Sequence, residues 1–555
     1  MSNPHPIRKR RATRNRASFL ADTVVPTHGF TRQRWGWIVA AIVLASLGAP
    51  NRWMHWYPAA LVGLSPLFFL GWNCRSIRRQ ALYCGVILLG FCALVFLPDP
   101  LSVPALTAAE TIAGALVSPI VPLYFMAAAL LSLQLSRPCP LWLRPLAIAA
   151  VWTAFDGLFA LLQFPLPLHY GACLFDFSHA IQIADVTGIW GVTFLAIFSN
   201  ATLAALFVSA KARISAKARI STKDRMSAKD HSLRHQWSSW IAVVLPAIIL
   251  WSAALLYGGH QESLYRPTGG RMVNAESFTV GTVQQVAWLS GDRSRQYRRD
   301  RYREMVKLSQ AAVADGAQLV VWPEGAMRIQ VAGSIDESLF VHPLLDSLPE
   351  EGGLMVGSSE LAPVTDSIPW DERKFINTAL LYDPNGTIRD RYGKQWLFQY
   401  FETSRFVPSE TGYSPLAAGD VLGSVGAQIC LESVMPRASR ELVRSGAESL
   451  VVISDDSWFG HSNWPILHGV LSVFRAIENR RSFVFVNNTG GNLIVTPAGD
   501  IAAAGQLWQQ RYVNGPVYRL NQGTIANRWG DWLVWVCLLS SAGLWGWRWF
   551  GTQAP

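Results

Sequence analysis

The sequence lacks the residue patterns on which several common active sites depend. It has no glycine-rich phosphate loop, no His-Glu-x-x-His motif and no Gly-x-Ser-x-Gly turn, so nucleotide, zinc and serine-hydrolase chemistry have no support. Cysteine is also scarce, because the seven cysteines among 555 residues are dispersed, without the spacing of a metal site or a disulfide framework. Between residues 270 and 525 there is one, Cys430, which is therefore either a small core residue or a nucleophile. We expect no metal and no cofactor.

Charged residues are few as well. They make up 15% of the chain, whereas 50% of the residues are hydrophobic and the mean hydropathy is +0.21. A chain of this length and hydropathy is expected to have more than one domain and to lie partly in lipid. The net charge of +11 would be compatible with a nucleic-acid partner. The basic residues, however, cluster beside apolar runs, in the N-terminal tail and in residues 211–234. Such clusters are typical of membrane topology signals, so we expect no nucleic-acid partner.

Long apolar runs predict a polytopic α-helical membrane domain with about eight transmembrane helices. Most of the runs reach the ~20 residues that are needed to cross ~30 Å of hydrocarbon. The basic tail is too long, and the first run too poor in a cleavage pattern, for a removed signal peptide, so the first run is expected to be an anchor. The runs cover residues 35–50, 57–73, 80–97, 106–134, 145–163, 183–209, 237–257 and 528–550.

The orientation of these helices can be predicted from charge. Lysine and arginine lie almost entirely in alternate loops, and Arg52 is the exception on the other side. Because cytoplasmic loops carry the excess of basic residues, both termini are expected to be cytoplasmic. The predicted organisation is a basic cytoplasmic tail at 1–34, a membrane domain with seven helices at 35–257, an extracytoplasmic catalytic domain at 270–520 and a C-terminal transmembrane helix at 528–550.

Residues 270–520 predict an α/β domain, since short β-rich runs alternate with helical stretches. Several of these runs end at a reactive residue, which is where open α/β sheets build their sites. Glu324 follows an apolar run and Pro323, Lys394 follows a turn, and Cys430 ends another apolar run. Each has an ordinary interpretation of its own, as a salt-bridged glutamate, an exposed lysine or a core cysteine.

Together the three residue types form a coherent device for acyl transfer through a thioester. A carboxylate can take the proton from a thiol, which at a pKa of ~8.5 is mostly unreactive at neutral pH. The thiolate attacks an acyl carbonyl, and a lysine ammonium and a backbone N–H stabilise the oxyanion that forms. An amine then takes the acyl group from the thioester.

Three longer stretches carry a family resemblance. Residues 44–72 are LASLGAPNRWMHWYPAALVGLSPLFFLGW, residues 181–206 carry a Gln-x-Ala, Gly-x-x-Gly, Phe-Leu and Asn pattern, and residues 454–481 carry Asp-x-Trp-Phe-Gly, Pro-x-x-His and Arg-Ala-x-Glu-x-x-Arg. The order Glu, Lys, Cys resembles the carbon–nitrogen hydrolase, or nitrilase, superfamily. Almost the whole chain after the tail resembles the apolipoprotein N-acyltransferases, the membrane-embedded branch of that superfamily.

The resemblance implies a nitrilase-like α-β-β-α sandwich fused to the membrane helices, and a role for each matching residue. It implies that Glu324 is the general base, Lys394 the oxyanion lysine and Cys430 the nucleophile. Further matching residues are Glu402 and Glu432, which would orient the lysine and the cysteine loop, and Trp458, Phe459 and Gly460, which would lie near an acyl pocket.

The resemblance also implies the substrates and the place of action. The donor would be a phospholipid, and the acceptor the N-terminal amine of a diacylglyceryl-cysteine apolipoprotein, at the bacterial inner membrane. Lifting an acyl chain of about fifteen methylenes into water would cost on the order of 12 kcal/mol, so the active site is expected to open to the bilayer. We expect a monomer.

The sequence departs from the family pattern at two places. Residues 397–402 read Leu-Phe-Gln-Tyr-Phe-Glu where the family usually has Leu-x-Pro-Phe-Gly-Glu, and Leu431 stands where an aromatic residue is common. These changes leave open a paralogue of conjugative transfer that resembles TraB proteins and uses the same chemistry on another acceptor. A membrane-tethered hydrolase of small amides and a non-catalytic scaffold or transporter are further alternatives.

Overall fold

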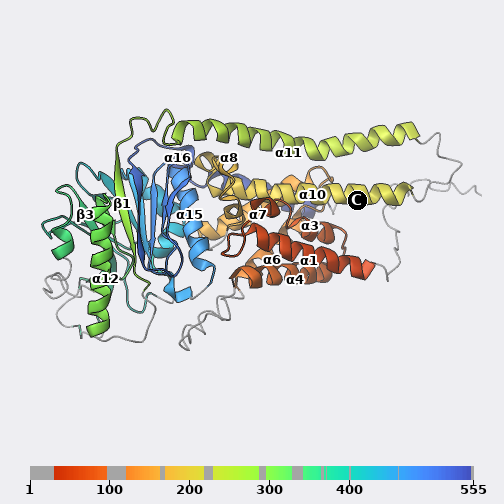
Figure 1. Cartoon of the computed structure of the whole chain (residues 1–555). Coiled ribbons are helices and arrows are strands. Elements are labelled where there is room, and N and C mark those ends of the chain that lie inside the picture. The colour runs from red at the N-terminus through yellow and green to blue at the C-terminus, as the bar shows by residue number, and fades with distance from the viewer. Residues whose placement is uncertain are drawn as a thin grey trace, which may run out of the picture.

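The computed structural model describes ten segments of the chain. They comprise residues 30–96, 120–162, 169–217, 229–286, 295–327, 342–363, 368–369, 372–398, 402–459 and 462–551. Two parts follow one another along the molecule, a bundle of helices and a pair of β-sheets flanked by helices (Figure 1).

The helical part is built from the apolar runs. Four helices in the described segments are long and apolar enough to cross a membrane: Ile77–Phe96, Arg144–Leu161, Ile189–Ala212 and Trp240–Tyr265. The N-terminal region thus contains several apolar helices, as predicted, while the number of eight spans stays a prediction. The main helices are α1 (Phe30–Gly48), α2 (Tyr57–Ala60), α3 (Ser65–Trp72), α4 (Ile77–Phe96), α6 (Ile120–Leu135), α7 (Arg144–Leu161), α10 (Ile189–Lys217), α11 (Lys229–Tyr265) and α17 (Trp532–Gly551).

Two apolar runs are interrupted where the sequence predicted continuous helices. In the run 57–73, a turn at residues 61–64 separates α2 from α3, and Pro66 stands at the start of α3. Gly63 in this turn packs closely against α1, since a Cβ on it would lie 2.6 Å from the Ala45 nitrogen. In the run 183–209, Gly188 has a φ of +66° and separates α9 (Ala184–Thr187) from α10. Of the run 106–134, residues 106–119 lie outside the described part.

The α/β part contains two six-stranded sheets packed face to face. One has the order β12-β1-β2-β3-β4-β5 and the other β11-β10-β9-β8-β7-β6. Strand β8 and strand β9 are buried along their whole length, which explains why they read as continuous apolar runs. The strands are β1 (Ser277–Gln284), β2 (Leu319–Val321), β3 (Gly353–Leu361), β4 (Phe375–Tyr382), β5 (Ile388–Gly393), β6 (Leu416–Ala417), β7 (Ser424–Ile429), β8 (Ser449–Ser454), β9 (Phe483–Asn487), β10 (Leu493–Val495), β11 (Ile501–Ala504) and β12 (Arg511–Tyr518).

Helices cover the outer face of each sheet. Helix α12 (Arg295–Ala314) packs on the first sheet, and α14 (Pro436–Arg444) and α15 (Trp464–Asn479) pack on the second. The result is the predicted α-β-β-α arrangement, in which α12 lies far from the membrane helices and α15 lies next to them (Figure 1).

Helix α15 and the residues that follow it join the two parts. Arg480, in the left-handed conformation and fully buried, donates to Asp185 at 2.6 Å and to Gln182 at 2.7 Å. Glu478 accepts from the backbone N–H of Ile189 at 2.8 Å. These buried polar contacts hold the second sheet, through α15, against the start of α10.

Candidate active site

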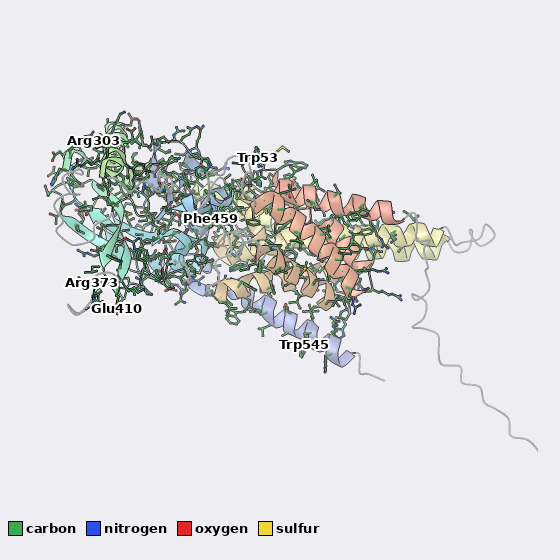
Figure 2. The ribbon with its side chains drawn as sticks, turned by 90° about the horizontal axis from the view of Figure 1, so that it is seen from below. Trp53, Arg303, Arg373, Glu410, Phe459 and Trp545 are labelled. Carbon is green, nitrogen blue, oxygen red and sulfur yellow. The ribbon has the colours of Figure 1, made fainter. Side chains whose placement is uncertain are left out.

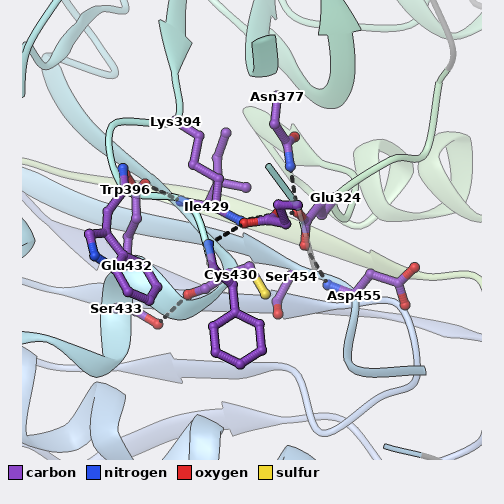
Figure 3. Close-up of polar contacts among 12 residues, drawn as sticks. Glu324, Asn377, Lys394, Trp396, Ile429, Cys430, Glu432, Ser433, Ser454 and Asp455 are labelled. Carbon is purple, nitrogen blue, oxygen red and sulfur yellow. Dashed lines mark hydrogen bonds and ion pairs between the residues drawn. The ribbon is translucent and has the colours of Figure 1, made fainter. Parts of the chain in front are cut away.

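Glu324, Lys394 and Cys430 come from three different strand ends and meet between the two sheets. Glu324 lies three residues beyond β2, Lys394 directly follows β5, and Cys430 directly follows β7. Figure 3 shows the three side chains around one small volume. The structure therefore brings together the three residues that the sequence singled out.

The Glu324 carboxylate is held by three neighbours. Its Oε1 accepts a hydrogen bond from Asn377 Nδ2 at 2.6 Å, and its Oε2 accepts from the backbone N–H of Asp455 at 3.0 Å. Lys394 Nζ lies 3.7 Å from Oε1. Burial raises the pKa of Glu324 to about 7, against the opposing effect of Lys394. The carboxyl group is thus able both to take and to return a proton near neutral pH.

Lys394 is a buried ammonium paired with carboxylates. Its side chain is 1% exposed, and Nζ donates to Glu402 Oε1 at 2.6 Å. Burial alone would lower the pKa of Lys394, but Glu324, Cys430 and Glu402 together raise it above its ordinary value. The ammonium is therefore a permanent positive charge beside the thiol, oriented by Glu402.

Cys430 sits on a strained backbone at the start of a short 3-10 helix, η3 (Cys430–Val434). Its φ is +55°, in the left-handed region that favours glycine. Burial raises the pKa of Cys430 well above its ordinary value, Glu324 adds to this effect and Lys394 opposes it. The thiol is consequently neutral at rest and needs a base to become a nucleophile.

Glu432 ties the cysteine loop to the lysine loop. One carboxylate oxygen accepts from the N–H of Ile429 at 2.8 Å, and the other accepts from the N–H of Gln395 at 2.8 Å and of Trp396 at 3.1 Å. Tyr392 OH donates to both oxygens at 3.1 Å. The side chain fixes the backbone on both sides of the site, since it joins the residue before Cys430 to the residues after Lys394.

Further residues that the sequence did not single out support the site. Asn377 lies within β4, where no local pattern distinguishes it from an ordinary strand residue. Asp455 and Asp456 directly follow β8, so their place at a strand end is a signal that could have identified them. Asp456 also begins the Asp-x-Trp-Phe-Gly motif, but no role of its own was predicted for it from the sequence. Asp456 accepts from Ser454 and Asn487 and lies 3.1 Å from His468 Nδ1.

His468 connects Asp456 to the loop that carries Cys430. Its Nε2 lies 2.8 Å from Ser433 Oγ, and Ser433 Oγ donates to the Cys430 carbonyl at 3.0 Å. This buried chain supports η3 from behind the thiol.

The loop 458–460, predicted to lie near an acyl pocket, follows Asp456 in η4 (Asp456–Phe459). Phe459 stacks on Trp464 at 4.6 Å between ring centroids, and Trp464 lies 5.6 Å from the Phe96 ring at the end of α4. This connects the active-site loops to the membrane helices. Of Trp458 only the backbone is described, and Gly460 lies outside the described residues.

The described part of the chain holds no cluster of three or more His, Cys, Asp or Glu residues with the geometry of a metal site. The reactive groups that meet in the site are a thiol, a carboxylate and an ammonium.

The fold of the α/β part is nitrilase-like, and residues 294–517 match the carbon–nitrogen hydrolase family. Residues 40–202 match the N-terminal domain of apolipoprotein N-acyltransferase. The chain is therefore similar to the apolipoprotein N-acyltransferases in both of its parts, which confirms the resemblance predicted from the sequence.

The chain is also similar to individual proteins. The chain is 28% identical to the apolipoprotein N-acyltransferase of Geobacter metallireducens over 65% of its own length and 66% of the relative's. It is 25% identical to apolipoprotein N-acyltransferase 2 of Treponema pallidum, over 71% and 74% of the two chains. Among solved structures, Nit3 of Saccharomyces cerevisiae, a member of branch 10 of the nitrilase superfamily, aligns with a TM-score of 0.34 and 17% identity, over 44% of this chain and 90% of Nit3.

Proposed function

We propose that the protein is a phospholipid-dependent N-acyltransferase, which moves a fatty acyl chain through a Cys430 thioester to the N-terminal amine of a diacylglyceryl-cysteine apolipoprotein. The observation that carries the proposal is the cluster of Glu324, Lys394 and Cys430 in a domain held against membrane helices. A hydrolase of small soluble amides has no use for those helices. An enzyme whose substrates are both lipids needs them, since neither substrate leaves the bilayer at low cost.

In the first half-reaction Cys430 takes the acyl group from the phospholipid. Glu324 accepts the thiol proton while Sγ attacks the ester carbonyl, and the Lys394 ammonium stabilises the oxyanion. The C–O bond of the ester then breaks, and the leaving alcohol of the lysophospholipid takes the proton from Glu324. The products are an acyl thioester on Cys430 and a lysophospholipid.

In the second half-reaction the acceptor amine attacks the thioester carbonyl. Lys394 again faces the oxyanion, and Glu324 takes a proton from the amine as the N–C bond forms. The C–S bond breaks and the Cys430 sulfur recovers its proton from Glu324. The products are an amide on the lipoprotein and the free thiol. Glu402 and Glu432 have positioning roles, because they hold the lysine and the two loops.

The surroundings of the site suit a lipid substrate. Trp53, Met54 and Trp56 are more than half exposed in the loop after α1. The backbone N–H of the neighbouring Arg52 donates to Asn463 Oδ1 of the α/β part at 3.2 Å. Figure 2 draws Trp53 and Phe459 at the junction of the two parts. Exposed tryptophans are typical of the interface between lipid and water, so this junction is where an acyl chain would pass from the bilayer to the site.

We further propose the arrangement in the membrane. The enzyme is a monomer of the inner membrane with eight transmembrane helices, seven in residues 35–257 and the last at 528–550. The basic tail 1–34 and the C-terminus are cytoplasmic, and the catalytic domain at 270–520 is periplasmic, where exported lipoproteins emerge. The charge asymmetry of the loops supports this orientation.

Intact-mass analysis of the purified full-length protein in phospholipid micelles tests the chemistry. We expect a mass increase of one acyl chain on the wild type, and its loss when a diacylated lipopeptide is added. Cys430→Ser should show no stable adduct, whereas Cys74→Ser, which removes a thiol in the helical part, should behave as the wild type. An adduct on Cys430→Ser would disprove the thioester. An adduct that the lipopeptide cannot discharge would disprove the acceptor.

A further inference from the structure

A basic pocket lies at the end of the helical part that is farthest from the active site. It has a volume of about 300 Å³ and is lined by Arg34, Leu70, Asn73, Cys74, Arg75, Ser76, Arg79 and Tyr83. The lining comes from the start of α1, the end of α3 and the start of α4, all of which point away from the β-sheets (Figure 1). The pocket is therefore separate from the catalytic site.

Positive charges surround this pocket, although it lies at the N-terminus of a helix, where negative charges are usual. Helix α4 begins at Ile77, and its first turn holds Arg78 and Arg79 but no acidic residue. The N–H groups and the dipole at a helix N-terminus favour anions and disfavour cations. Arg75, just before the helix, and Arg34, from α1, add two more cations to the same lining. An anion in the pocket would lie beside three guanidinium groups and near the N-terminus of α4.

The walls of the pocket are fixed by hydrogen bonds. Lys211, from the end of α10, donates to Asn73 at 3.0 Å. Arg137 donates to the Cys74 carbonyl at 2.7 Å, and the fully buried Gln80 donates to the Gly71 carbonyl at 2.6 Å. Arg34 donates to Tyr83 OH at 3.1 Å. The loop between α3 and α4 is thus held in place without a ligand, as a preformed binding site requires.

We propose that this pocket binds a phosphate-bearing anion, and specifically the headgroup of an anionic phospholipid in the leaflet opposite the catalytic domain. Arg34, Arg75 and Arg79 would face the phosphate, and guanidinium groups suit phosphate because they donate two parallel hydrogen bonds. A lipid fits better than a free ion, because the lining includes Leu70 and comes partly from α4, an apolar helix long enough to cross a membrane. Basic pockets between membrane helices are known to hold such headgroups.

The test is native mass spectrometry of the full-length protein, titrated with phosphatidylglycerol or with zwitterionic phosphatidylcholine. We expect tighter binding of phosphatidylglycerol, and at least a tenfold loss of that binding in the double variant Arg75→Gln/Arg79→Gln. Arg78→Gln is the matched control, since Arg78 lies in the same turn but outside the lining, and should bind as the wild type. Arg79→Lys keeps the charge but loses the paired donors, so it should bind phosphatidylglycerol more weakly than the wild type and more tightly than the double variant.

Two further measurements distinguish a lipid headgroup from free phosphate and check that the double variant is folded. Inorganic phosphate should displace phosphatidylglycerol, and binding of inorganic phosphate without binding of the lipid would overturn the lipid assignment. Acylation of Cys430, which takes place at the other end of the molecule, should be retained in the double variant and so reports its fold. Equal binding of both lipids, or unchanged binding by a double variant that still acylates, would overturn the proposal.

Discussion

The Glu324 carboxyl governs how the proposed reaction depends on pH. Burial raises its pKa to about 7, so near neutral pH it is divided between its acid and its ionised form. Only the ionised form can accept the Cys430 proton. We therefore expect the rate of Cys430 acylation to rise with pH through about 7 and to level off above it, because more of the enzyme then carries the base in its active form.

Removal of the Asn377 hydrogen bond should shift that profile. Asn377 donates to Glu324 Oε1 at 2.6 Å and so stabilises the ionised form. Asn377→Leu should raise the pKa of Glu324 further, which moves the rise in acylation to higher pH and lowers the rate more at pH 6 than at pH 8.5. Acylation rates measured by mass across this range check the prediction.

The neighbouring Thr378 provides the control for that experiment. It is buried on the same strand, but its hydroxyl donates to the Ile376 carbonyl and has no bond to Glu324. Thr378→Val should leave the midpoint of the profile unchanged. A slower Asn377→Leu enzyme with an unshifted midpoint would show that Asn377 has only a structural role.

For single residues, the sequence predicted the candidate reactive side chains but not the residues that hydrogen-bond to them. Glu324, Lys394 and Cys430 were found because each follows a strand or a turn and has a chemically distinctive side chain. Asn377 was not found, since an asparagine inside a strand carries no local signal. Its importance depends on the pairing of β3 with β4, which places it opposite Ser359 and brings β4 beside the Glu324 turn.

At the scale of elements, the site depends on two loops that leave different sheets. The loop after β5 carries Lys394 and the loop after β7 carries Cys430, and Glu432 accepts hydrogen bonds from both. The buried Glu432 carboxylate accepts hydrogen bonds from four donor groups. A glutamine amide could not replace it, because the amide has one acceptor oxygen, and its NH₂ group would face backbone N–H groups that also donate.

Replacement of Glu432 by glutamine should therefore loosen both loops. We expect Glu432→Gln to reduce stability by on the order of 2 kcal/mol, because buried donors are left unpaired. It should also slow acylation by more than tenfold. Tyr392→Phe removes only one of the donors and should have a smaller effect on both. Thermal unfolding in detergent and acylation kinetics measure the two quantities.

The relative losses of stability and acylation rate in Glu432→Gln and Tyr392→Phe test this role of Glu432. If Glu432→Gln slowed acylation without any loss of stability, its role would lie in the reaction itself. If Tyr392→Phe had the larger effect, the proposed bridge between the loops would be wrong.

Elements were predictable where local sequence determines them. The strands β8 and β9 and the helix α15 follow from apolar runs and their periodicity. The division between α2 and α3 was missed, although Pro66 at the start of α3 is a local signal for a helix boundary. The role of Arg480 as a link to Asp185, in contrast, emerges only once both parts are in place.

At the scale of the whole molecule, exposed tryptophans mark two levels along the helical part. One lies near the junction with the sheets, at Trp53 and Trp529, and the other near the far end of α17, at Trp545 and Trp549. From Trp532, at the start of α17, to Trp549 the helix rises about 26 Å, at 1.5 Å per residue. This is close to the thickness of ~30 Å of a hydrocarbon core, so the two levels fit its two interfaces.

The proposed orientation predicts which side of the membrane each end of the molecule faces. Glu410 is exposed at the end of the α/β part (Figure 2), and Ile214 is 71% exposed near the end of α10. A membrane-impermeant maleimide should label Glu410→Cys in intact spheroplasts, and should label Ile214→Cys only after permeabilisation, because the two ends lie across the bilayer. Wild-type protein serves as the background for the natural cysteines. The reverse pattern would invert the topology.

The backbone at Cys430 has a consequence for how the sequence can vary. A side chain in the left-handed region is disfavoured, whereas glycine adopts it freely. In the tight turn after β7, glycine would relieve the backbone strain at position 430, but glycine has no thiol and cannot form a thioester. A Cys430→Gly chain should fold at least as well as the native one while it has no nucleophile. Cysteine at this position therefore lowers the stability of the fold in exchange for a thiol. A library selected for thermal tolerance alone would be expected to lose this proposed nucleophile early.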